Sequence, residues 1–231
     1  GQFAGVSNTD WSWSALLVDL DNDGLRDIFI TNGYLRDITN MDRMTHTSEV
    51  YKKAASNREN VDYLKLIKEL PASKLKNYVY KNSTGIKFIN KTEDWGLDQR
   101  TVSNGAAYAD FDNDGDYDLI TNNLNQPVSA LRNNQSEKLK NNFIRIKLVG
   151  SKLNSQGTGA KIWLETEDKS IFQEAYTARG YLSSSDPVIS LGIGSSTVIK
   201  SLKVRWPDGR LTLVKELAPN QLIKLVYPES Q

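Results

Sequence analysis

Cysteine is absent from the 231-residue sequence, and His46 is its only histidine. Disulfides therefore cannot stabilise the fold, and bound metal ions could take that role in an extracellular protein. A Ser-His-Asp relay would depend on this one histidine, in an insertion between the repeats described below. The sequence also contains no Gly-x-Ser-x-Gly nucleophile motif and no glycine-rich phosphate-binding loop. These absences predict a chain without catalytic residues.

An excess of one charge and long apolar runs are missing as well. The formal net charge is +1, which gives no reason to expect a nucleic acid or a strongly acidic partner. No apolar run approaches the ~20 residues of a membrane-spanning helix, and no secretory signal peptide is recognisable. We therefore expect no transmembrane segment, and either one large domain or two modest ones.

Aspartate, by contrast, is concentrated in two short segments. The pattern D-x-D-x-D-G-x-x-D occurs at residues 19–27 and again at residues 110–118, and these segments hold nine of the eighteen aspartates. Carboxylates crowded into one loop repel each other unless a cation lies between them. Because the ligands are all oxygen atoms, the pattern predicts a hard cation, Ca²⁺ before Mg²⁺. The alternative is a solvated acidic turn without metal, which two copies with identical spacing disfavour.

Each copy offers side chains at positions 1, 3, 5 and 9, a carbonyl at position 7, and a glycine at position 6 for the sharp turn. Position 9 would close the site directly or through water. The sequence therefore predicts two Ca²⁺ sites. Their predicted ligands are Asp19, Asp21, Asp23, the Leu25 carbonyl and Asp27 in the first copy, and Asp110, Asp112, Asp114, the Asp116 carbonyl and Asp118 in the second.

The copies do not match an EF-hand. An EF-hand needs a glutamate at position 12 and a helix on each side, whereas position 12 is Ile30 in one copy and Thr121 in the other. The flanking segments are short and apolar, which is typical of strands. Each copy is thus predicted to be a strand–loop–strand unit closed by metal.

The spacing of the copies indicates β-propeller-like blades. They begin 91 residues apart, and removing the insertion at residues 37–76 leaves about 51, which is within the period of propeller blades. We expect about two blades in residues 1–133. Two blades cannot close a ring, so we expect a longer parent protein and self-association through open strand edges. The expected strands are 15–18, 28–31, 78–81 and 87–90 in the first unit, and 105–109, 119–122 and 128–132 in the second.

The insertion at residues 37–76 is predicted to be helical. Val61, Leu64, Ile67 and the adjacent Leu70 recur at helical spacing between lysines, Asn60 could cap the helix, and Pro71 ends the run. A solvated basic face is the preferred interpretation, and a partner-binding lid is the alternative.

The last part of the chain has a different pattern. Residues 134–141 are polar and are interpreted as a linker. Beyond them, about seven short alternating segments separated by turns predict a small β-sandwich over residues 142–231, so that the fold class is mainly β. At residues 179–185 we expect Gly180 to form a bulge and Tyr181 to pack in this sandwich; the alternative is that Arg179 and Tyr181 face a glycan or peptide.

These motifs resemble known families. The doubled Asp loop with its strand flanks resembles the FG-GAP/VCBS repeat family, which builds Ca²⁺-binding β-propellers. The C-terminal region resembles the ASPIC/UnbV domain, through NFIRIKLVG at 142–150, GTGAK at 157–161, RGYLSS at 179–184, LGIG at 191–194 and WPDG at 206–209. The pairing of the two modules is similar to the cartilage acidic protein 1 family and to large bacterial surface-type proteins.

The resemblance implies a calcium-stabilised, noncatalytic binding or adhesion module that is secreted or lies at the cell surface, outer-membrane-associated or periplasmic in a bacterium. Glycans or extracellular proteins would be its ligands. Two alternatives stay open. One is part of a polysaccharide-processing enzyme, which would need a pair of carboxylates in a pocket. The other is a purely structural scaffold.

Overall fold

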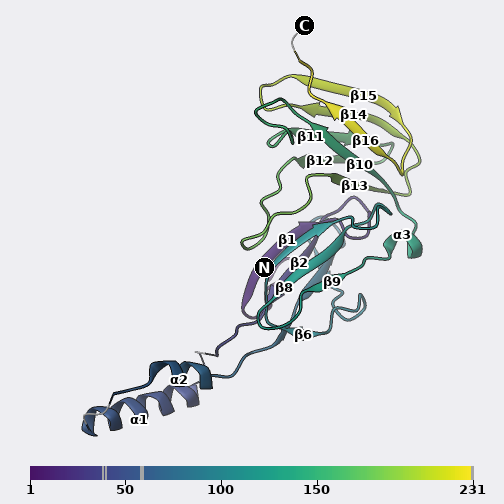
Figure 1. Cartoon of the computed structure of the whole chain (residues 1–231). Helices are drawn as coiled ribbons and strands as arrows, with labels where there is room; N and C mark the ends of the chain where they lie inside the picture. Colours follow the sequence, from purple (N-terminus) through teal and green to yellow (C-terminus); the bar gives the residue numbers. More distant parts are fainter. Residues whose placement is uncertain (38, 40, 58–59, 230–231) are drawn as a thin grey trace.

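The computed structural model describes residues 1–229 apart from 38, 40, 58 and 59 (Figure 1). Two antiparallel sheets form the middle of the molecule, a pair of helices projects from one end, and further strands form the other end (Figure 1). The prediction of a mainly β fold is confirmed.

The first sheet contains the first Asp pattern. Its strand order is β1-β2-β4-β5, and all neighbours are antiparallel. The inward face of β1 is made by alternate residues, since Ser14, Leu16 and Val18 are buried whereas Leu17 is exposed. Each of the four strands expected in this unit is present. They are β1 (Ser12–Val18), β2 (Asp27–Asn32), β4 (Tyr78–Asn82) and β5 (Phe88–Asn90).

The second sheet repeats this arrangement with three strands, in the order β7-β8-β9. One hydrophobic cluster joins the two sheets, with Leu16 and Phe29 from the first and Tyr108 and Leu119 from the second. The three strands expected here are present, while the assignment of the two sheets to β-propeller-like blades stays a prediction. The strands are β7 (Ser103–Ala109), β8 (Asp118–Asn123) and β9 (Ser129–Leu131), and β3 (Leu75–Lys76) pairs with β6 (Arg100–Thr101) beside them.

The insertion forms two helices, α1 (Met41–Asn57) and α2 (Tyr63–Glu69), which extend away from the sheets (Figure 1). The predicted cap at Asn60 is wrong. The carboxylate of Asp62 accepts the N–H of Lys65 at 3.0 Å and begins α2 two residues later than expected. As predicted, the helix ends before Pro71, because a residue that precedes proline is forced into an extended conformation.

The C-terminal region consists of seven strands in two sheets, ordered β13-β10-β16 and β12-β11-β14-β15. Both sheets contribute to one core, which includes Ile146, Ile162 and Trp206. This arrangement is the C-terminal sandwich. Its strands are β10 (Asn142–Val149), β11 (Lys161–Glu165), β12 (Ser170–Glu174), β13 (Ile189–Gly194), β14 (Ile199–Arg205), β15 (Leu211–Leu217) and β16 (Leu222–Val226).

The segment interpreted as a linker contains a one-turn helix, α3 (Gln135–Lys138). Its first side chain is buried, and the Gln135 Nε2 group donates to the carbonyl of Asp21 at 2.7 Å. The segment therefore packs against the first Asp pattern as well as connecting the two regions.

Candidate metal centre

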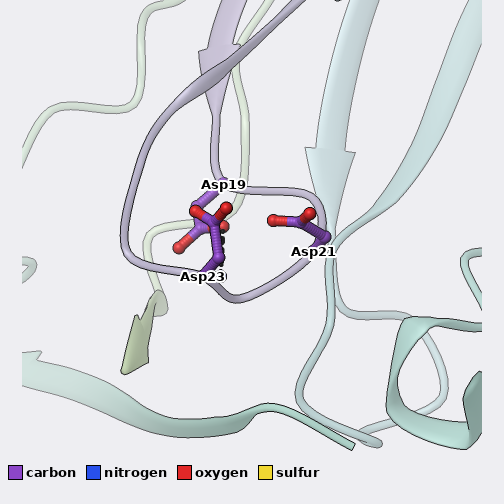
Figure 2. Close-up of side chains that lie close together, drawn as sticks. All are labelled: Asp19, Asp21 and Asp23. Atoms are coloured by element: carbon purple, nitrogen blue, oxygen red, sulfur yellow. Dashed lines mark hydrogen bonds between the residues drawn. The ribbon is translucent and has the colours of Figure 1, made fainter. Parts of the chain in front are cut away.

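The first Asp loop (residues 19–27) connects β1 to β2. The Asp19, Asp21 and Asp23 carboxylates each offer one oxygen within 4.8 Å of the other two, and they face one another inside the loop (Figure 2). The turn is formed by Asn22 and Gly24, which have φ angles of 54° and 87°. Glycine adopts this region without strain, and asparagine tolerates it better than most residues. The prediction that positions 1, 3 and 5 converge is therefore matched by the geometry of this loop.

Asp27 and Leu25, the other predicted ligands of this loop, have different surroundings. The two oxygens of Asp27 accept the N–H groups of Leu20 at 3.0 Å and Asn82 at 2.8 Å, which ties the loop to β4. Burial raises the pKa of Asp27 to about 7. The N–H of Leu25 donates to Asp23 at 2.8 Å. Asp27 thus braces the loop from outside the group of three.

The second Asp loop (residues 110–118) gathers a different set of carboxylates. Here Asp110, Asp112 and Asp118 lie within 4.8 Å of one another. Asp118 also repeats the bracing role of Asp27, because its oxygens accept the N–H groups of Phe111 at 3.0 Å and Asn133 at 2.7 Å.

Asp114 and Asp116, also predicted as ligands, lie against α3. Asp114 accepts the Ser136 hydroxyl at 2.7 Å, and Asp116 accepts the Ser136 N–H at 2.9 Å. Burial raises the pKa of Asp116 to about 7. The second loop therefore uses two of its five carboxylates to hold α3.

Three basic side chains, which the sequence pattern did not identify, pair with the gathered carboxylates. The Lys81 ammonium on β4 contacts Asp21 and lies 3.1 Å from an oxygen of Asp23. In the second loop, Arg132 Nε lies 2.7 Å from Asp112, and Arg145 Nε lies 3.0 Å from Asp110. Each of these cationic residues lies outside the loop that it contacts, so the spacing of residues within the loop does not predict it.

Even with these cations, each loop keeps a buried oxygen that makes no hydrogen bond within the described part of the chain. These atoms are Asp21 Oδ1 in the first loop, and Asp110 Oδ1 and Asp116 Oδ1 in the second. A buried acceptor without a donor is costly, and the cost is greater for a charged group. Burial, followed by the charge of Asp27, also raises the pKa of Asp19. A hard cation that accepts oxygen ligands fits this donor set.

The first Asp loop also lies against the C-terminal sandwich. The N–H of Gly194, at the end of β13, donates to the carbonyl of Asn22 at 2.8 Å. The Lys169 ammonium donates to the carbonyl of Asp23 at 2.5 Å. Contact is closest at Gly192, where a Cβ atom would lie 2.3 Å from Asn22 Cα.

The second Asp loop contacts the same sandwich. Ser190 on β13 donates to the carbonyl of Gly115 at 2.9 Å, and Arg145 on β10 donates to Asn113 at 3.0 Å. The two loops also touch each other, since the Asn22 amide donates to the Gly115 carbonyl at 3.3 Å. We call the two Asp loops with β10, β13 and Lys169 the domain joint. The predicted metal loops are thus also the place where the sheets meet the sandwich.

Residues 179–181 form a further contact between the two regions and correct an expectation. Tyr181 does not pack in the sandwich: its ring lies 5.1 Å from that of Trp13, its N–H donates to Ser14 at 3.1 Å, and it is 40% exposed. Gly180, at a φ of 78°, allows this approach to β1 because a Cβ would lie 2.3 Å from the Ser14 hydroxyl. The segment therefore fastens the sandwich to the first sheet.

The fold and its loops define a mainly β protein in which two Asp loops join two sheets to a C-terminal sandwich. Residues 150–231 match the family model described as ASPIC and UnbV. The chain is also 34% identical over 130 residues to cartilage acidic protein 1 of Xenopus tropicalis, and 30% identical over 133 residues to the proteins of that name in Mus musculus and Homo sapiens.

These alignments cover 54–55% of this chain and 20% of each relative, so the chain spans about a fifth of the length of these relatives. The resemblance to the ASPIC/UnbV domain and to cartilage acidic protein 1 is confirmed. The FG-GAP/VCBS resemblance of the Asp loops stays a prediction. Within the described residues, no helix has the length and apolar character needed to cross a membrane.

Proposed function

We propose that this chain is a calcium-stabilised, noncatalytic binding module that works outside the cell, secreted or at the cell surface. Its two Ca²⁺ ions would neutralise the Asp loops and thereby hold the sheets and the sandwich in one orientation. The observation that carries this proposal is the pair of gathered carboxylate groups, each with a buried oxygen that finds no donor among the residues the structure describes.

In this proposal Asp19, Asp21 and Asp23 would hold one ion and Asp110, Asp112 and Asp118 the other. The bound ions would supply positive charge where the loops concentrate negative charge. The chain's own groups keep the loops in place: backbone amides hold Asp27 and Asp118, and β13 holds Asn22. Strand β9 ends the second sheet and leaves an edge for a further blade or for a second copy of the chain. The edge of β5 is partly used, since the Phe88 N–H donates to the Ala4 carbonyl at 3.0 Å.

Isothermal titration of metal-free protein with Ca²⁺ tests this function. We expect two sites with dissociation constants of about 10⁻⁴–10⁻³ M, as in other open extracellular loops. Asp21→Asn and Asp112→Asn should each lose one site. Asp98→Asn is the matched control, because it removes one exposed carboxylate outside both loops, and it should keep two sites. A chain that takes up no Ca²⁺ at 10 mM would contradict the proposal.

Lys81 gives a prediction in the opposite direction. Its ammonium lies among the carboxylates that Ca²⁺ would bind, so the ion and the lysine compete for Asp21 and Asp23. We expect Lys81→Met to tighten Ca²⁺ binding in the first loop about fivefold, because two unit charges ~4 Å apart in water repel by about 1 kcal/mol. The same titration measures this change. An unchanged affinity would mean that Lys81 does not compete with the ion for Asp21 and Asp23. A weaker affinity would mean that Lys81 holds these carboxylates in place for the ion.

A further inference from the structure

The outward side of the sheet β12-β11-β14-β15 presents aromatic and basic side chains together. Ile162, Leu164, Leu202 and Val204 point into the sandwich core and are fully buried, so the residues that alternate with them point outward. We call this side the aromatic–basic face. It comprises Lys161, Trp163, Glu165, Phe172, Glu174, Lys203, Arg205, Leu211, Leu213 and Lys215.

Trp163 lies at the centre of this face. The strand register places Phe172 opposite it on one side and Lys203 on the other, with Leu213 beyond Lys203, so that one row crosses all four strands. The rings of Trp163 and Phe172 are 5.4 Å apart, and the Lys203 ammonium lies 4.8 Å from the centre of the Trp163 ring. Arg205 lies 5.9 Å from the same ring. The row is about 14 Å long, given the usual strand spacing.

The composition of this face is unusual for a surface without a ligand. Phe172, Leu211 and Leu213 are 44%, 60% and 54% exposed. Four of its side chains are cationic and two are carboxylates, so this one face carries a charge of +2 although the whole chain carries +1. Cations that border an aromatic ring can bind an anionic group while the ring packs against an apolar surface.

We propose that the aromatic–basic face binds an anionic polysaccharide. The C–H face of a sugar ring packs on Trp163 and Phe172, and the carboxylate or sulfate groups pair with Lys203 and Arg205. A polysaccharide fits better than a nucleic acid because Glu165 and Glu174 lie on the same face: these carboxylates repel a continuous row of phosphates, whereas the hydroxyl groups of a sugar can donate hydrogen bonds to them. This inference names the ligand class of the binding module and rests on that part of the proposed function.

The test is binding of the full chain, with Ca²⁺ present, to alginate and to chondroitin sulfate, with dextran as the uncharged comparison. We expect both anionic polymers to bind, with affinity that falls as salt rises, and dextran to bind much more weakly. Trp163→Ala and the pair Lys203→Gln with Arg205→Gln should each weaken binding roughly tenfold. The pair Lys147→Gln with Lys224→Gln is the charge-matched control for the double variant, since both lysines are exposed in the opposite sheet, on β10 and β16, and it should bind as the parent does.

The outcomes separate this inference from the calcium proposal. If all variants bind alike, or neither anionic polymer binds, the assignment of this face is overturned while Ca²⁺ titration still reports on the Asp loops. Equal or tighter binding of single-stranded DNA would also overturn it, because the face would then recognise any polyanion. Retained polysaccharide binding in a chain that takes up no Ca²⁺ would overturn the calcium proposal alone. The double variant lies on the surface and keeps the test valid if Trp163→Ala fails to fold.

Discussion

In buffer with EDTA, the chain should unfold at a temperature roughly 5–20 °C below that in 10 mM Ca²⁺. A ligand at 10–100 times its dissociation constant adds about 1.4–2.7 kcal/mol per site, and 10 mM is about 10–100 times the dissociation constants expected for such loops. The two sites add these free energies together. In a chain of 150–250 residues, each kcal/mol of added stability raises the unfolding temperature by about 2–4 °C. Differential scanning calorimetry measures the shift directly.

The same measurement on variants assigns the shift to the loops. Asp21→Asn and Asp112→Asn should each lose about half of the rise, because each removes a ligand from one loop only. Asp98→Asn should show the full rise. Mg²⁺ should stabilise less, because it demands near-octahedral geometry and gives up its water reluctantly. If Ca²⁺ left all the melting curves unchanged, the Asp loops would be acidic turns held by Lys81, Arg132 and Arg145 alone.

The strands could be predicted from the sequence because their signals are local. Alternation of apolar and polar residues identifies the buried side of a strand such as β14 from its own residues, since Leu202 and Val204 are buried whereas Lys203 and Arg205 are exposed. The convergence of Asp19, Asp21 and Asp23 is local as well, since all three lie within one turn of chain. The cap of α2 was misplaced because Asn60 and Asp62 are both good caps, and sequence spacing alone does not choose between them.

The carboxylates that gather in the second Asp loop could not be predicted from local sequence. It has the same spacing as the first, yet Asp114 lies outside the group of three and Asp118 lies within it. The difference comes from Ser136 on α3, which binds Asp114 and Asp116 and lies 22 and 20 positions further along the chain. The compensating Lys81 is 60 positions from Asp21. Such partners are set by tertiary packing, so identical motifs can have different surroundings.

The domain joint could not be predicted from the sequence either. The Lys169 contact with the first Asp loop spans 146 positions. Arg145 alternates with apolar residues along β10, a pattern that predicts an exposed side chain. The domain joint explains two features of the C-terminal sandwich. The LGIG motif at 191–194 places a residue without a side chain against Asn22. Arg145 is buried because it reaches the second loop.

Gly192→Ala should open the joint at the first Asp loop. The new Cβ would lie 2.3 Å from Asn22 Cα and 2.4 Å from an oxygen of Asp19, and the backbone atom cannot move aside as a flexible side chain would. Relieving this overlap requires β13 and the loop to separate, at a cost of about 1–3 kcal/mol. Because Asn22 lies between two ligands, Ca²⁺ affinity in the first loop should fall about tenfold, which corresponds to about 1.4 kcal/mol.

A change on the opposite side of the same strand provides the control. Ile193 is fully buried in the sandwich core, and Ile193→Val should lower stability by about 0.5–1.5 kcal/mol without altering Ca²⁺ binding. Urea unfolding and calcium titration of both variants separate the two effects. If Gly192→Ala bound two Ca²⁺ ions with parental affinity, the contact between β13 and the loop would contribute to packing but not to calcium affinity. A loss confined to the first site would show that calcium and the C-terminal sandwich stabilise each other through Asn22, as reciprocal linkage requires.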